Sequence, residues 1–123
     1  MGKGKAWILI LVMLLVAGCR RDVGHVAKFV PGGDAAAGRN AIVAYGCGAC
    51  HMIEGIPDAD AYVGPPLVKY EQRHYIAGNL PNTAENLVYW IQFPQTIEPG
   101  TAMPNMGVTE NDARNIAAYL YSQ

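Results

Sequence analysis

The residues best suited to chemistry lie together in one short run, Cys47-Gly48-Ala49-Cys50-His51. Two thiols three positions apart can add to the two vinyl groups of one haem, and a histidine directly after the second thiol then lies beneath the iron as an axial ligand. The spacing therefore predicts one covalent haem c, attached through Cys47 and Cys50, with His51 on the iron.

Three other interpretations of this run fit the sequence less well. A thioredoxin-like pair follows a strand in a βαβ pattern, and the sequence shows no such pattern. A zinc site needs further ligands, and His25 and His74 do not stand at a zinc-binding spacing. A plain disulfide between Cys47 and Cys50 would not call for a histidine beside it.

The N-terminus has the features of an export signal. Lys3 and Lys5 precede an uncharged stretch over residues 6–17, which is shorter than the roughly 20 residues of a membrane-spanning helix. Val16-Ala17-Gly18-Cys19 resembles the bacterial lipobox, whose cysteine is acylated. We therefore predict a signal peptide over residues 1–18 and lipidation of Cys19, with an uncleaved anchor helix as the alternative.

The rest of the chain divides into a tether and one domain. Residues 19–33 show no periodicity and end in Pro31-Gly32-Gly33, which predicts a lipid-anchored tether. Residues 34–123 form the predicted domain. The net charge of −1 argues against a nucleic-acid partner, which requires a basic surface.

Helical signals dominate this domain. Asp34 is a plausible N-cap for a helix to about Tyr45, and the spacing of Asn82 and Glu85 is that of a capping box for a helix that Pro94 ends. Residues 109–112 open a last helix, and a short one is possible over 67–76. No segment alternates convincingly as a strand, so the predicted class is all-α, with three to four short helices and long loops. The last helix has apolar positions at helical spacing: Ala113, Ile116, Ala117 and Leu120.

Long loops leave such a domain little apolar surface of its own to bury, and a large flat cofactor would supply it. The chain from Gly33 onward resembles a class I cytochrome c in several separated features. These are the helix before the attachment motif, Gly64-Pro65-Pro66-Leu67 after it, a middle helix, the stretch Glu98-Pro99-Gly100-Thr101-Ala102-Met103-Pro104, and a C-terminal helix with Ala118-Tyr119-Leu120.

The resemblance implies roles for residues outside the motif. The Pro65 carbonyl would accept a hydrogen bond from the axial histidine, and Leu67 would pack on the haem face. Met103, which follows Pro-Gly-Thr-x, would be the distal ligand, whereas Met106 is the alternative ligand or a packing residue. The first and last helices would cross where Gly38 and Ile42 meet Ile116 and Tyr119. Candidate donors to the haem propionates are Arg73, Tyr75, Asn82 and Trp90.

An iron with two protein ligands has no vacant place for substrate, which predicts a one-electron carrier rather than an enzyme. The alternative is a haem enzyme or gas sensor with a labile distal ligand. The lipid would hold the domain on a membrane, facing the periplasm or the cell exterior. There it would serve a respiratory or related chain, alone or as a subunit of a membrane complex. Its expected partners are a quinol-oxidising complex or a terminal oxidase.

Overall fold

The structure, a computed structural model, describes residues 28–123. The predicted signal peptide, Cys19 and His25 lie outside the described residues, as does the tether up to residue 27. No helix within the described part is both long enough and apolar enough to cross a membrane.

The first and last helices of the domain begin where the sequence predicts. Asp34 caps α2 (Ala35–Ala44), because its Oδ1 accepts a hydrogen bond from the Ala37 N–H at 3.0 Å. Thr109 caps α5 (Glu110–Tyr121) through a 3.2 Å hydrogen bond from the Asp112 N–H to its Oγ1. The acids in the first turn of α5 face the positive end of the helix dipole.

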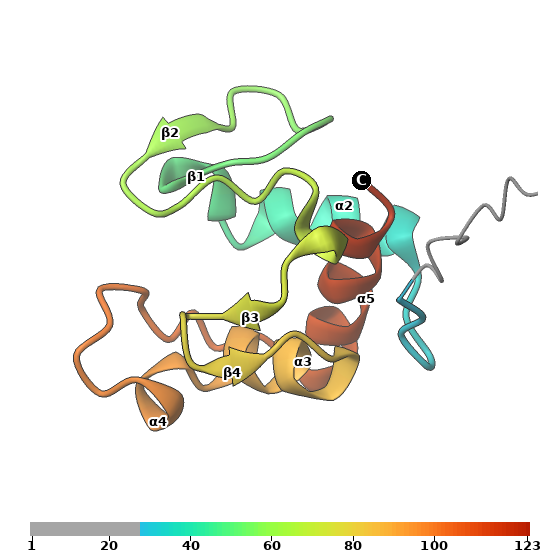
Figure 1. The fold of residues 1–123 in the computed structure, drawn as a ribbon. Coiled ribbons are helices and arrows are strands. Elements are labelled where there is room, and N and C mark those ends of the chain that lie inside the picture. Colours follow the sequence, from blue (N-terminus) through green and yellow to red (C-terminus); the bar gives the residue numbers. More distant parts are fainter. Residues whose placement is uncertain (1–27) are drawn as a thin grey trace, which may run out of the picture.

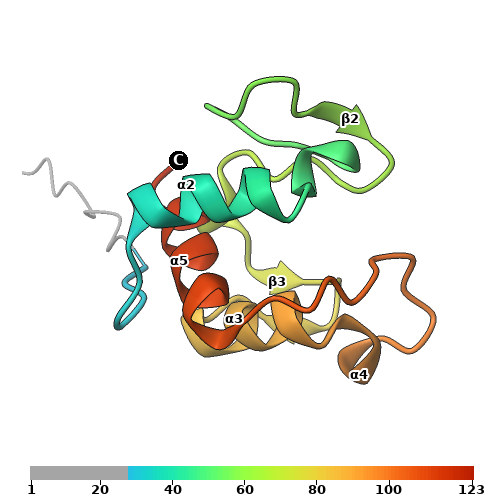
Figure 2. The same ribbon diagram turned by 180° about the vertical axis from the view of Figure 1, so that it is seen from behind.

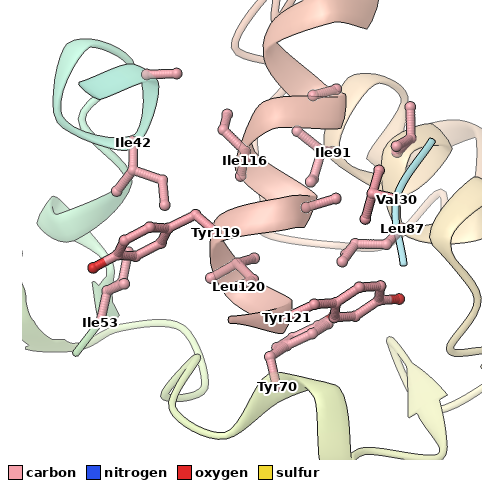
Figure 3. Packing of buried hydrophobic residues seen from close by; sticks show 14 of the residues in the cluster. Val30, Ile42, Ile53, Tyr70, Leu87, Ile91, Ile116, Tyr119, Leu120 and Tyr121 are labelled. Carbon is pink, nitrogen blue, oxygen red and sulfur yellow. The ribbon is translucent and has the colours of Figure 1, made fainter. Parts of the chain in front are cut away.

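Helices α2 and α5 cross at the predicted residues (Figure 2). A Cβ on Gly38 would overlap the Asn115 carbonyl, so only glycine allows the two backbones to approach so closely. Ile42 faces Ile116 and Tyr119 beside this crossing (Figure 3). The crossing is therefore fixed by the lack of a side chain at Gly38 and by the apolar packing of Ile42.

The middle helix differs in detail from the prediction. The cap of α3 (Ala84–Gln92) is Thr83, whose Oγ1 accepts from the Asn86 N–H at 3.3 Å, and not Asn82, which is buried. Pro94 ends α3 as predicted but also starts a short helix, α4 (Pro94–Ile97). Proline suits a first helical position, where its missing N–H would have no intrahelical partner.

Two short antiparallel strand pairs were not predicted. One joins β1 (His51–Met52) to β2 (Asp60–Tyr62), and the other joins β3 (Tyr75–Ile76) to β4 (Leu80–Pro81). Strands of two or three residues are too short to show an alternating pattern. The pairs lie on opposite sides of the molecule, with α3 and α4 on the side of β3 and β4 (Figure 1). The fold remains mostly helical with long loops, as the class assignment requires.

The helix considered for residues 67–76 is reduced to one 3₁₀ turn, η2 (Tyr70–Gln72). The described part of the predicted tether, residues 28–33, also differs from a free linker. Val30 is 3% exposed, and Lys28 Nζ donates a 3.0 Å hydrogen bond to the Arg73 carbonyl. The described end of the predicted tether therefore packs on the domain.

The core is organised around α5. Its predicted apolar positions are all buried, and α3 packs beside it through Leu87 and Ile91 (Figure 3). Seven core side chains also line a cavity, so the apolar interior continues into that space: Ile42, Tyr70, Leu87, Ile91, Val108, Ile116 and Leu120.

Candidate haem site

A cavity of about 400 Å³ lies among the attachment motif, the loop over residues 63–67 and the loop over residues 101–108. This volume is in the usual range for small-molecule and cofactor sites, roughly 300–1,000 Å³. Its walls are mainly apolar, and the two thiols, the motif histidine and both candidate methionines all face it. The residues of the attachment motif and the candidate ligands that line it are Cys47, Cys50, His51, Met103 and Met106.

The attachment motif follows directly from the end of α2. Gly46 adopts a left-handed conformation with φ of +70°, which turns the chain into the 3₁₀ turn η1 (Cys47–Ala49). Cys47 and Cys50 are free thiols, both partly buried. Burial raises the pKa of the Cys47 thiol, whereas thioredoxin-like chemistry needs the pKa lowered. The Cys47 thiol is therefore less suited to disulfide exchange than a thioredoxin-like thiol.

His51 is held by the loop that follows the motif. Its Nδ1 lies 2.7 Å from the Pro65 carbonyl oxygen. Because a carbonyl only accepts, Nδ1 carries the hydrogen and Nε2 keeps its lone pair, which is the form that binds a metal. His51 also lines the cavity, so the predicted hydrogen-bond partner and the predicted ligand lie together.

The unpredicted strands explain how this loop is placed. His51 pairs with Tyr62 across β1 and β2. Beyond β2, the Gly64 N–H donates to the Cys50 carbonyl at 2.7 Å, and the Leu67 N–H donates to the Met52 carbonyl at 2.8 Å. These bonds bring Leu67 into the cavity wall.

Met103 also lines the cavity, on a loop that is braced by hydrogen bonds. Its N–H donates to Thr101 Oγ1 at 3.2 Å, and its carbonyl accepts from Gln95 Nε2 at 2.6 Å. Its side chain is partly buried. Met106 also lines the cavity; it is 46% exposed and is not part of the buried core cluster. The bracing contacts of Thr101 and Gln95 carry no recognisable sequence signal.

Three of the four candidate propionate donors line the cavity: Arg73, Tyr75 and Trp90. Asn82 does not. Both hydrogens of its side-chain amide are donated to backbone carbonyls, those of Tyr70 and Arg73, at 3.0 and 2.9 Å. The expectation that Asn82 contacts a propionate is therefore wrong. Its buried amide already donates both hydrogens to partners within the fold and has none left for a propionate.

The structure does not favour the zinc interpretation of the motif. Within residues 28–123, no three His, Cys, Asp or Glu side chains are grouped to hold a metal ion. The cavity instead offers two thiols, one oriented imidazole and apolar walls. That set fits a flat apolar group attached through both thiols, with iron at its centre.

A mostly helical domain whose core continues into such a cavity, and whose C-x-x-C-H motif lies in the cavity wall, defines a class I c-type cytochrome. Residues 35–123 match the family described as Cytochrome c, and the chain belongs to that family. Its cofactor is covalent haem c, with Cys47 and Cys50 in the positions of the motif. Its function is therefore haem-based electron transfer.

One relative is the cytochrome c oxidase subunit 2 of Alkalihalophilus pseudofirmus. It is 36% identical over 86 residues, which cover 69% of this chain and 24% of the relative. The chain thus spans about a quarter of that protein's length. No solved structure matches the chain significantly.

Proposed function

We propose that the protein is a one-electron carrier whose haem iron is ligated by His51 and Met103. The observation that supports this proposal most directly is that the oriented imidazole of His51 and the thioether of Met103 line one apolar cavity. An iron ligated on both sides exchanges electrons without binding substrate, and a thioether favours the reduced state and a high potential. The role of the chain is to attach, orient and enclose the haem.

The mouth of the cavity is where a redox partner would approach. Val63, Tyr75 and Met106 line the cavity and are 79%, 60% and 46% exposed, so they form an apolar rim. Among residues 28–123, the only Lys, Arg, Asp or Glu residues that line the cavity are Arg73 and Glu98. Arg73 donates to the Pro66 carbonyl, and Glu98 accepts from Asn79 Nδ2 at 3.2 Å. A partner would therefore dock mainly through apolar contacts.

The proposed location is a membrane surface outside the cytoplasm. The signal over residues 1–18 would export the chain, and a lipid on Cys19 would hold it on the membrane facing the periplasm or the cell exterior. A quinol-oxidising complex would supply its electrons and a terminal oxidase would accept them, either in free exchange or within one complex. The oxidase relative supports this respiratory setting.

The optical spectrum tests the proposed ligation. A carrier with both axial positions filled shows a low-spin oxidised form with a sulfur-to-iron charge-transfer band, and it binds carbon monoxide slowly or not at all. A high-spin oxidised form that binds small ligands at once would instead identify a haem enzyme or gas sensor. The measurement needs only the purified protein with its haem attached.

A further inference from the structure

Asn82 is buried, with 6% of its surface exposed, yet it lies outside the cavity. Besides the two hydrogen bonds of its side chain to the Tyr70 and Arg73 carbonyls, its backbone N–H donates to the His74 carbonyl at 2.9 Å. Three hydrogen bonds thus join Asn82 to one turn over residues 70–74. The residue closes that turn at the base of the β3–β4 hairpin.

The remaining polar atom of the Asn82 side chain, Oδ1, is bound by a residue of α5. The Tyr121 hydroxyl donates to Asn82 Oδ1 at 2.7 Å, and the two rings of Tyr70 and Tyr121 lie close together (Figure 3). Burial, together with Tyr70 and Glu85, raises the pKa of Tyr121 far above its ordinary value, so the hydroxyl keeps its proton. Lys28 adds a second hydrogen bond to the Arg73 carbonyl and lies 5.4 Å from the centre of the Tyr121 ring.

The turn held in this way presents Arg73 to the cavity. The Arg73 guanidinium lies 4.9 Å from the centre of the Tyr70 ring and donates to the Pro66 carbonyl. The preceding carbonyl, that of Pro65, accepts from His51 Nδ1. Arg73 and His51 therefore hold neighbouring carbonyls of one short segment. A shift of the turn changes both the position of a cation and the orientation of the imidazole.

We propose that Asn82, locked by Tyr121, is a positioning residue that sets the redox potential of the haem by holding Arg73 and the Pro65–Pro66 segment in place. A fixed positive charge beside a redox centre stabilises the form that has gained an electron. A hydrogen bond to the non-ligating nitrogen of a metal-bound histidine tunes the metal as well. The inference rests on the proposed ligation of the iron by His51.

The test compares the only two buried polar side chains among the described residues. Asn82→Ala and Asn115→Ala remove the same atoms from sites that are each 6% exposed. Asn115 Oδ1 accepts from the Asp34 N–H at 2.9 Å and does not line the cavity, so it is the matched control. Each variant, with haem attached, is measured by redox titration, by thermal unfolding and by hydrogen exchange of the His51 Nδ1–H in the reduced state.

Both variants should lose stability, but only Asn82→Ala should lower the midpoint potential. The same variant should speed exchange of the His51 Nδ1–H roughly tenfold, which corresponds to about 1.4 kcal/mol. Tyr121→Phe, which removes one hydroxyl, should change the midpoint potential and the exchange rate in the same directions but by less. If Asn82→Ala does not fold, the Tyr121→Phe variant tests the proposal. Equal potential shifts in the two alanine variants, or none, would overturn the proposal. An oxidised spectrum that is high-spin in the wild type would instead reject the ligation on which it rests.

Discussion

Gly64 lies against the imidazole of His51, and a Cβ on Gly64 would overlap that ring, with His51 Nδ1 at 2.7 Å. The side chain of any other residue there would push the imidazole off the Pro65 carbonyl. Gly64→Ala should therefore destabilise the haem-bound protein by about 1–3 kcal/mol, as overpacking does, and weaken the low-spin spectrum. Thermal unfolding and optical spectroscopy measure the two effects.

Gly100→Ala is the matched control for that substitution. A Cβ on Gly100 meets only the far end of Glu98, at 3.8 Å. Its unfolding free energy should stay within about 0.5 kcal/mol of the wild type. A Gly64→Ala protein that behaves like Gly100→Ala would show that the fit between Gly64 and His51 does not constrain the ligand.

Met103 is predicted to be the distal ligand. Met103→Ala should lose the sulfur-to-iron charge-transfer band, fall in midpoint potential and gain binding of small ligands, because removing the thioether opens a coordination site. Met106→Ala should change none of these, and its stability should shift by only about 0.5 kcal/mol, since Met106 lies outside the buried core cluster. If the band instead vanishes in Met106→Ala and survives in Met103→Ala, the ligand assignment is reversed.

Folding is predicted to require the haem. Without the haem, the apolar side chains that line the cavity would face water. Each loses roughly 1.5–3 kcal/mol when it is left exposed instead of fully buried, against a total stability of about 5–15 kcal/mol for a small domain. Replacing both Cys47 and Cys50 with alanine should therefore leave a largely disordered domain. The measurement is the thermal unfolding of this double variant, and a sharp transition like that of the wild type would contradict the prediction.

Partner docking is predicted to depend on the apolar rim. Val63→Lys places a charge at the cavity mouth and should slow electron transfer to a purified cytochrome c oxidase about tenfold, whereas transfer to ferricyanide should not slow. Phe29→Lys is the control, because Phe29 is 78% exposed, like Val63 at 79%, but lies away from the cavity. The wild-type rate should also vary little with salt, unlike a charge-steered encounter. A strong fall with salt, or equal slowing in both variants, would count against the rim.

Lipidation of Cys19 is predicted to hold the mature protein on the membrane, since two or more acyl chains give stable anchoring where one is marginal. Cys19→Ser should therefore move the protein from the membrane fraction to the soluble fraction. Western blotting of the two fractions after a high-salt wash gives the result. A Cys19→Ser protein that stays with the membrane would point to an uncleaved helix or a bound partner.

Local signals in the sequence determined the helices and the cofactor. Asp34 and Thr109 cap their helices through contacts three residues away, and C-x-x-C-H joins its groups within five positions. Such features depend on short-range geometry that the order of residues already defines. The predicted crossing of α2 and α5 at Gly38 came from the resemblance, because it joins residues nearly eighty positions apart.

Only the tertiary structure decided which side chains meet across long separations. Asn82 looked like a helix cap and a propionate donor, but its amide is buried against the turn over residues 70–74 and bound by Tyr121 from α5. The strand pair that orients His51 is too short to leave a pattern in the sequence. A buried polar group is satisfied by whichever partners the folded chain brings to it, and that choice is made by packing rather than by local sequence.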